Sequence, residues 1–456
     1  MRPILALLIL LALSGSAQST TEVLSDQGDQ PRGAVVLVVD GMGSAYVYPE
    51  LMPRALDGTP LKRALLFNLT GKGARVLNLT VPVPETGPSH SVLVTGCSWA
   101  DSSILGTPGA TIFDAARAEG LLCLAILQRG DAMSMVLEQD GVLFFDDNSL
   151  WGAEPLVGSK ADLPSDLADL FQSWRDEFPE YNRERGVPGY VGYNAWGLDA
   201  AADVVGAMGT RPFLLMVNVG AVDSAGHNLG AARYVEIISG LDAPLGRLLE
   251  ACEAGGVLLL VTADHGMSFP SDRGKGGHSS AKYSSLAESV MVPAVFVGPG
   301  VDEIAVTGNW SEVDLAPTLL DLLGLLGKRP DLPLSEGRVI PVSKRCDLIV
   351  DAGKVADVEV RRDGPLVARA SGDSRYIFRS LDRGSYTVVS AGRKTSVYLD
   401  GDRAVDLPIE APRGFGAVLS PIFDRENRKL VAGILILAIN LLGALLIFSI
   451  VKKGRF

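Results

Sequence analysis

Seven short runs rich in valine, leucine and isoleucine place the strongest constraint on the fold of this 456-residue chain. They predict strands over 34–39, 74–81, 122–127, 142–145, 213–219, 257–261 and 292–297. Most are almost continuously apolar, which is typical of strands buried on both faces of a mostly parallel sheet. Helical patterns lie between them, including 229–253 and 313–326. The alternation predicts an α/β domain over 33–342, with a doubly wound, mostly parallel sheet.

Two segments depart from this alternation. Residues 155–200 carry several Pro, Gly, Tyr and Trp residues without a clear period, and we interpret them as an insertion that caps the site. Residues 345–410 contain short strand candidates separated by turn-forming pairs such as Gly372-Asp373. This spacing predicts a small all-β sandwich module after the α/β domain.

Both ends of the chain carry apolar segments. Residues 1–18 combine Arg2, an apolar run and small residues, which is the pattern of a secretory signal peptide. Residues 430–451 carry no charge and are long enough to cross a hydrocarbon core of about 30 Å. With a linker over 411–429 and a basic tail over 452–456, the pattern predicts a single-pass protein of the cell membrane, with an extracellular catalytic domain and a cytoplasmic C-terminus.

Charge and cysteine content exclude other classes of protein. The formal net charge of −12 disfavours nucleic-acid binding, which requires a basic face. The four cysteines are too few and too scattered for a disulfide framework, although one bridge between Cys97 and Cys123 stays open. The oligomeric state is not readable from the sequence.

All four histidines lie beside residues suited to metal chemistry. They stand in Asp223-Ser224-Ala225-Gly226-His227, in Asp264-His265-Gly266, in Gly276-Gly277-His278, and at His90 after Thr86-Gly87-Pro88-Ser89. Asp40 ends the first apolar run, and the other aspartates follow later runs. Because ligands collect at the carboxyl ends of strands in open α/β sheets, we expect these side chains to meet at one edge. Carboxylate oxygen and imidazole nitrogen are donors that zinc accepts, and the set is large enough for two metals.

Thr86 is the candidate nucleophile. It follows the strand 74–81 in a proline-rich turn, and a helix is expected to begin near Ser89. The start of a helix presents unpaired backbone N–H groups that favour an anion. A threonine hydroxyl is a weak nucleophile unless it is activated, and coordination to a metal is one way to activate it.

The order of these motifs resembles the alkaline phosphatase superfamily, and most closely its type I phosphodiesterase/nucleotide pyrophosphatase branch. The resemblance covers about residues 33–330 and rests on five motifs. They are Val38-Val39-Asp40-Gly41-Met42-Gly43, Thr86-Gly87-Pro88-Ser89-His90 through Thr95-Gly96, Asp223 to His227, Asp264-His265-Gly266-Met267 and Gly276-Gly277-His278. The segment 313–319 also resembles the helix that follows these motifs in the superfamily.

The resemblance implies two divalent metal ions, expected to be Zn²⁺. One ion would be held by Asp223, His227 and His278, and the other by Asp40, Asp264 and His265, with Thr86 bridging towards it. Thr86 would form a covalent phosphothreonine during hydrolysis of a phosphate ester, with a phosphodiester or pyrophosphate as the expected substrate. His90 is expected to orient the nucleophile loop or to pack, and not to bind metal.

One position departs from the branch. Its motif has Asn where this chain has Ser89, and the serine hydroxyl is expected to contact a phosphate oxygen of the substrate. Three alternatives therefore stay open: a phosphomonoesterase, a sulfatase-like hydrolase, and a non-catalytic surface binding protein. Thr86 disfavours the sulfatase, because that class modifies a Cys or Ser at this position. A phosphoglycerate mutase would share two of these motifs, Asp223 to His227 and Asp264-His265-Gly266, but the serine motif of the mutases is absent from this sequence.

Overall fold

The structure is a computed structural model that describes residues 21–24, 30–64, 66, 69, 71–128, 135–326, 332–343, 345–399 and 403–407. The described chain divides into two compact units. The larger comprises 26–346 with 380–383, and the smaller is built from the segment before 26 and from 347 onwards, apart from 380–383. The expected signal peptide over 1–18, linker over 411–429, span over 430–451 and tail over 452–456 lie outside the described residues.

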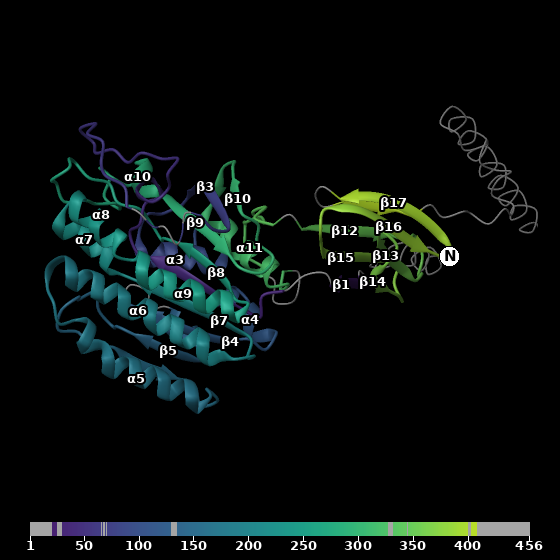
Figure 1. Ribbon diagram of the computed structural model, residues 1–456, viewed down its shortest axis with the longest axis horizontal. Coiled ribbons are helices and arrows are strands. Elements are labelled where there is room, and N and C mark those ends of the chain that lie inside the picture. The colour runs from purple at the N-terminus through teal and green to yellow at the C-terminus, as the bar shows by residue number, and fades with distance from the viewer. Residues whose placement is uncertain are drawn as a thin grey trace, which may run out of the picture. The chain divides into compact units, whose positions relative to one another are not determined.

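A large mixed sheet runs through the larger unit (Figure 1). Its strands lie in the order β10 (Ile304–Val306), β3 (Ala74–Thr80), β9 (Met291–Val297), β8 (Leu258–Thr262), β2 (Gly33–Val39), β7 (Phe213–Val219), β4 (Leu122–Leu127), β5 (Gly141–Phe144) and β6 (Leu156–Ser159), with β11 (Trp310–Ser311) beside β3. All seven strands predicted from the apolar runs are present within two residues of their predicted bounds. Strands β2, β7 and β8 are buried at every position, as expected for strands covered on both faces.

The sheet is parallel at its centre and antiparallel towards its edges. Strands β8, β2, β7, β4 and β5 pair in parallel. Strand β9 is antiparallel to both β8 and β3, and β6 is antiparallel to β5. Because β9 is antiparallel to both β3 and β8, these two strands run in the same direction. The carboxyl ends of β2, β3, β7 and β8 therefore reach the same edge of the sheet.

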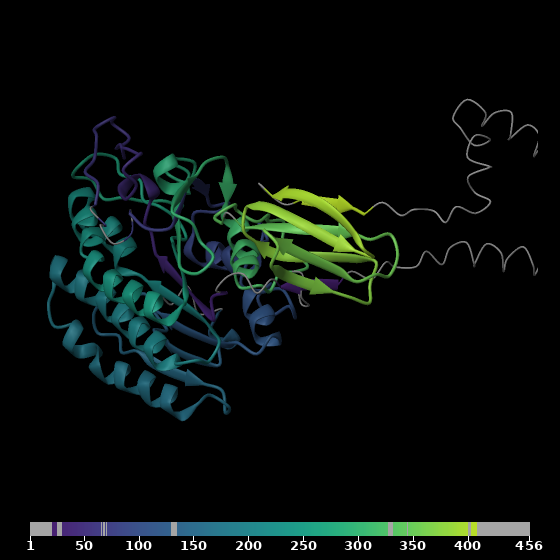
Figure 2. The same cartoon turned by 45° about the vertical axis from the view of Figure 1, so that its right-hand side comes forward.

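Helices cover both faces of this sheet (Figures 1 and 2). One group contacts β4, β5, β7 and β8 and consists of α5 (Ser165–Tyr181), α6 (Gly186–Met208) and α9 (Asp242–Gly255). A second group of mutually contacting helices consists of α3 (Thr86–Thr95), α4 (Ile112–Ala118) and α11 (Leu315–Leu322). The helical segment predicted over 229–253 is two helices, α8 (Ala231–Ser239) and α9, and a short helix α10 (Ala287–Val290) precedes β9. The doubly wound arrangement is as predicted.

Residues 155–200 do not form the irregular cap that the sequence suggested. They contain β6, α5 and most of α6, and Trp196 on α6 is fully buried in the main core. The glycines of α6 lower its intrinsic helix propensity, so the sequence of this segment does not clearly indicate a helix. One of them has a packing role, because a Cβ at Gly197 would lie 2.8 Å from the Gln128 side chain. Close packing against the sheet therefore decides the conformation of this segment.

The smaller unit is all-β and has two four-stranded sheets (Figure 2). One contains β1 (Thr21–Leu24), β15 (Arg375–Leu381), β12 (Cys346–Asp351) and β18 (Arg403–Asp406), and the other contains β14 (Leu366–Ala370), β13 (Val358–Arg362), β16 (Gly384–Ser390) and β17 (Arg393–Leu399). Alternating burial in β12 and β16 matches strands that cover a core with one face. Strand β1 was not predicted: it comes from the start of the chain and pairs in parallel with β15.

The predicted location in a cell membrane is corrected. Within the described ranges, no helix has both the length and the apolar character needed to cross a bilayer. The longest is α6, which carries Asn194, Asp199 and Asp203 and packs against β7 and α9. The span expected over 430–451 lies outside those ranges.

Candidate metal centre and nucleophile

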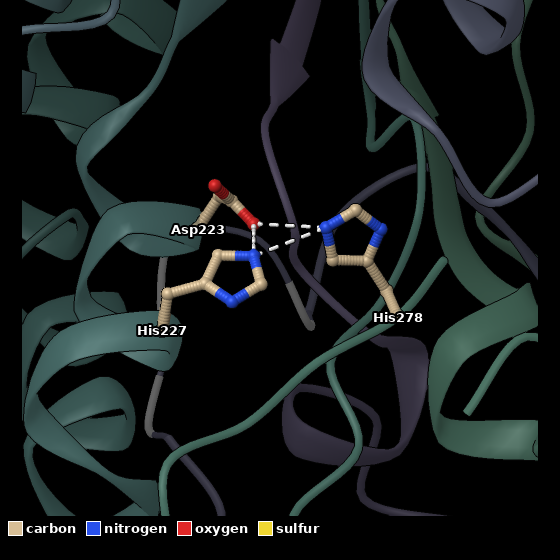
Figure 3. A group of neighbouring side chains, drawn as sticks. All are labelled: Asp223, His227 and His278. Carbon is tan, nitrogen blue, oxygen red and sulfur yellow. Dashed lines mark hydrogen bonds and ion pairs between the residues drawn. The ribbon is translucent and has the colours of Figure 1, made fainter. Parts of the chain in front are cut away.

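Asp223, His227 and His278 form the first group of converging side chains (Figure 3). Asp223 and His227 lie one turn apart on α7 (Ala221–Leu229), which begins directly after β7. His278 reaches them from the segment between β8 and β9. The Nε2 atom of His227 lies 3.2 Å from Asp223 Oδ1 and 3.1 Å from His278 Nε2, and His278 Nε2 lies 3.5 Å from Asp223 Oδ1.

Asp40, Asp264 and His265 form the second group. Asp40 follows β2, and Asp264 and His265 follow β8, its neighbour in the sheet. All three side chains are fully buried, with His265 Nε2 at 3.4 Å from Asp40 Oδ1 and 3.6 Å from Asp264 Oδ2. The imidazole rings of His265 and His278 stack with centroids 3.6 Å apart, so the two groups adjoin.

His227, His265 and His278 each direct the Nε2 atom towards the other side chains of their group. Each Nδ1 lies within hydrogen-bond distance of a backbone carbonyl: Gly276 for His227, Gly266 for His265 and Pro84 for His278. A carbonyl can only accept, so Nδ1 carries the proton and Nε2 is left with its lone pair towards the carboxylates. Burial, together with nearby His265, lowers the pKa of His278 to about 4, which keeps its imidazole neutral at pH 7.

This geometry fits a bound cation. Three atoms that each carry a lone pair, Asp223 Oδ1 and the Nε2 atoms of His227 and His278, lie 3.1–3.5 Å from one another. Such atoms repel unless a positive charge lies between them. In the second group, Asp264 Oδ1 accepts from the backbone N–H groups of Gly41 and His265, whereas its buried Oδ2 accepts no hydrogen bond within the described part of the chain. Histidines held through Nδ1 and carboxylates held by amides are usual in metal sites.

Gly41 allows the turn after β2 to lie directly against α7. Its φ of +77° lies in the left-handed region, and a Cβ there would lie 2.9 Å from the Asp223 backbone. Only glycine adopts this conformation without strain at such close range. Gly41 therefore places the turn after Asp40 against α7.

Thr86 lies at the first turn of α3, next to the second group. Its Oγ1 is 3.3 Å from His265 Nε2, and its residue is 8% exposed. Helix α3 begins at Thr86, three residues earlier than the sequence suggested, so the hydroxyl lies where unpaired N–H groups of a first turn are found. The structure thus brings the candidate nucleophile and all six candidate ligands to one edge of the sheet.

His90 and Ser89 occupy the buried side of α3. His90 Nδ1 donates to the Thr86 carbonyl at 2.8 Å, and its Nε2 lies 3.2 Å from the Asn218 amide nitrogen. This agrees with the expectation that His90 orients the nucleophile turn. Ser89 is fully buried, and its Oγ lies 2.5 Å from the Asp264 carbonyl and 2.5 Å from Glu312 Oε1. Its single proton is therefore engaged within the protein, which does not suit the predicted contact with substrate.

Tyr234 is a site residue that the sequence did not indicate. Its fully buried hydroxyl donates to the Gly41 carbonyl at 2.7 Å and accepts from the Gly43 N–H at 3.2 Å, which fixes the turn after Asp40. Burial raises the pKa of this phenol far above its usual value, so it remains a donor. The residue lies on α8 without any recognisable motif around it, so only the fold reveals its position.

Replacing Tyr234 with phenylalanine is expected to weaken metal binding by about 10- to 100-fold, because the turn that holds Asp40 loses its support. Tyr48→Phe is a matched control: this buried hydroxyl also makes two backbone hydrogen bonds, both to Ala294, away from the turn. Both variants should lose stability by about 1 kcal/mol per hydrogen bond. Isothermal titration of metal into the apoprotein measures the difference, and equal affinities in the two variants would contradict the role of Tyr234.

Comparison with known proteins gives a family match over part of the chain. A family model described as the metalloenzyme superfamily matches residues 167–325, the segment that carries five of the six candidate ligands. Curated relatives include a 2,3-bisphosphoglycerate-independent phosphoglycerate mutase 2 of Methanosarcina acetivorans, 31% identical over 112 residues (25% of this chain and 20% of the relative). The mutase of Paracoccus denitrificans is 31% identical over 172 residues (36% of this chain and 32% of the relative). The chain thus spans between a fifth and a third of the length of these relatives.

Two solved structures that align with this chain are a phosphatase and a synthase. The alkaline phosphatase PafA gives a TM-score of 0.47 at 13% identity, covering 69% of this chain and 99% of that chain. The lipoteichoic acid synthase LtaP from Listeria monocytogenes gives a TM-score of 0.45 at 10% identity, covering 82% and 86%.

The matched family model supports a metalloenzyme, and the two groups are the candidate ligands for a divalent metal. The family model, the order of the motifs and the meeting of their ligands at one sheet edge agree with one another. Residues 167–325 therefore resemble the metalloenzyme superfamily, which supports the resemblance seen in the sequence at the level of the superfamily.

Proposed function

We propose that the protein hydrolyses phosphate esters, preferring phosphodiesters or pyrophosphates, through a covalent phosphothreonine on Thr86. The observation that carries the proposal is the position of Thr86. Its Oγ1 lies 3.3 Å from His265 Nε2, at the start of α3 and beside two adjoining groups of metal-ligand type. A hydroxyl in this position can attack a phosphorus atom held at the same edge of the sheet.

Different residues of the site have different roles in this reaction. Thr86 Oγ forms a bond to phosphorus while the ester bond to the leaving group breaks, and the proton lost by threonine is balanced by one gained by the leaving oxygen. Water then cleaves the phosphothreonine and restores the hydroxyl. The first turn of α3 directs backbone N–H groups towards the phosphoryl oxygens. Two divalent ions, proposed to be Zn²⁺, would supply Lewis acidity and charge neutralisation when bound.

Asp223, His227 and His278 would hold one ion, and Asp40, Asp264 and His265 the other, with Thr86 at its edge. Histidines with Nδ1 tied to carbonyls, together with buried carboxylates, provide an N/O donor set of the kind zinc uses. A phosphomonoesterase or a sulfatase-like hydrolase is the alternative that the same site could serve. The similarity to phosphoglycerate mutases adds a phosphoryl transfer between hydroxyl groups of one substrate as a further candidate.

Removal of the metal is expected to abolish hydrolysis, because the charge of a phosphoryl transition state would then be unopposed. The purified full-length chain would be assayed with bis(p-nitrophenyl) phosphate, p-nitrophenyl phosphate and p-nitrophenyl sulfate. Each substrate would be tested after treatment with EDTA and again after addition of Zn²⁺. Diester cleavage that EDTA removes and Zn²⁺ restores supports the proposal.

The same assay separates the alternatives. Preference for the monoester or the sulfate ester would assign the protein to the corresponding class of hydrolase. Stoichiometric zinc without turnover of any ester would favour a binding protein. A chain that cleaves the diester equally well in EDTA would contradict the metal-dependent mechanism.

A further inference from the structure

Glu312 is a buried acid that no step of the proposed reaction uses. It opens the short 3₁₀ turn η3 (Glu312–Asp314) before α11 and is fully buried. It belongs to neither group of candidate metal ligands. Its Oε1 lies 2.5 Å from Ser89 Oγ, and Ser89 Oγ lies 2.5 Å from the Asp264 carbonyl oxygen. Three segments that are far apart in the sequence thus meet at one hydroxyl.

The number of protons available at the Ser89 hydroxyl determines which group donates in each of its two hydrogen bonds. Ser89 Oγ carries one proton and lies close to two oxygen atoms. The Asp264 carbonyl can only accept, so the serine proton is directed to it. The contact with Glu312 then needs a second proton, which only the Glu312 carboxyl can provide. Glu312 therefore donates to Ser89, and Ser89 donates to Asp264.

The surroundings of Glu312 favour this neutral form. Its second oxygen, Oε2, is buried and accepts no hydrogen bond from any residue that the structure describes, which costs much less for a carboxylic acid than for a carboxylate. Burial is the main cause that raises the pKa of Glu312 well above its usual range; the hydrogen bond with Ser89 acts against it, and the negative charge of Asp264 adds to it. Neither observation would fit an ionised side chain at this place.

The turn that carries Glu312 is itself held firmly. Asp314 accepts from the backbone N–H groups of Ser311 and Arg338, and the Asp314 carbonyl accepts from Thr318 Oγ1. Its partner Ser89 lies one turn beyond Thr86 on α3, and Asp264 directly precedes His265. A relay from a fixed turn to Ser89 and on to Asp264 therefore joins the nucleophile helix to the second ligand group.

We propose that Glu312 is a positioning residue that, as a neutral acid donating to Ser89, sets the distance between Thr86 and the Asp264–His265 segment. This role rests on the proposed function, in which Thr86 attacks beside that segment. Loss of the relay should lower kcat more than it raises KM, since the substrate contacts remain while the nucleophile is displaced.

Glu312→Gln and Glu312→Ala would be compared in the full-length protein. Glutamine can donate from its amide nitrogen to Ser89 and keeps the relay, so kcat should stay within about threefold of the wild type, whereas alanine should lower kcat by about 10- to 100-fold. Tyr48→Phe is the control, because it removes a buried hydroxyl that bonds to the Ala294 backbone without touching Ser89 or the turn that carries Glu312. Its kcat should match that of the wild type.

Two readouts do not need turnover. The infrared difference spectrum of wild type minus Glu312→Gln at neutral pH should show the C=O band of a protonated carboxylic acid. Hydrogen exchange of the α3 amides should be faster in Glu312→Ala than in Glu312→Gln. Both measurements test the role of Glu312 without a substrate. A failure of this proposal can therefore be distinguished from a failure of the proposed function. A missing acid band, or a Gln variant as impaired as the Ala variant, would overturn the proposal.

Discussion

Replacement of Thr86 with alanine is expected to lower kcat for phosphate-ester hydrolysis on the order of 10³-fold or more, the scale of loss seen when a covalent nucleophile is removed. Thr86 Oγ1 is the hydroxyl 3.3 Å from His265 Nε2, and alanine provides no atom that can attack phosphorus. Metal content should change little, because all six carboxylate and imidazole ligands remain. Steady-state kinetics and elemental analysis of the same preparation measure both quantities.

Two variants make this test specific. Thr86→Ser keeps a hydroxyl and should retain measurable turnover, with the phosphorylated residue identified by mass spectrometry of acid-quenched enzyme. Thr95→Ala removes a buried threonine hydroxyl from the other end of α3, where it bonds to the Ser91 carbonyl, and should leave kcat unchanged. Hydrolysis by Thr86→Ala at the wild-type rate would exclude the phosphothreonine mechanism.

The fold of the larger unit was predictable wherever strands are buried on both faces. Strands β4 and β7 have the bounds that their apolar runs predict, because burial on both faces leaves few polar positions. The direction of β9 was not predictable. Its sequence is as apolar as that of its parallel neighbours, and only the path between Thr262 and Met291 brings it into the sheet in reverse. Strand β1 was missed because its partner β15 lies some 350 residues later.

The site was predictable where a motif places its residues at a strand end. Asp40, Asp223 and Asp264 each follow a central strand, and the structure brings them together with the three histidines. Their role as ligands stays a prediction. Residues that support the site from distant segments left no local signal: Tyr234 lies within an ordinary amphipathic helix, and Glu312 lies in a short polar turn. The hydroxyl of Ser89 was assigned to the substrate because no local pattern showed that Glu312 and Asp264 engage it.

Replacement of Asp264 or Asp223 with asparagine is expected to remove one metal equivalent each and to lower kcat about 10²- to 10³-fold, since a bound metal contributes several kcal/mol to transition-state stabilisation. The two residues lie in different groups, so each variant should keep the ion of the other group. Asparagine at 264 retains an oxygen that can accept from the N–H groups of Gly41 and His265, so the local fold should survive. Elemental analysis of dialysed protein gives the metal content.

Asp140→Asn is the control for both substitutions. Asp140 is also buried and also accepts from a backbone N–H group, that of Cys123, but it lies outside both groups, directly before β5. This variant should keep both metal equivalents and its turnover, even if it is less stable. If Asp264→Asn and Asp223→Asn both retain full metal content, the two groups are not the metal centre. If either one releases both ions, the groups bind metal as a single unit, because the stacked rings of His265 and His278 then couple the two sites.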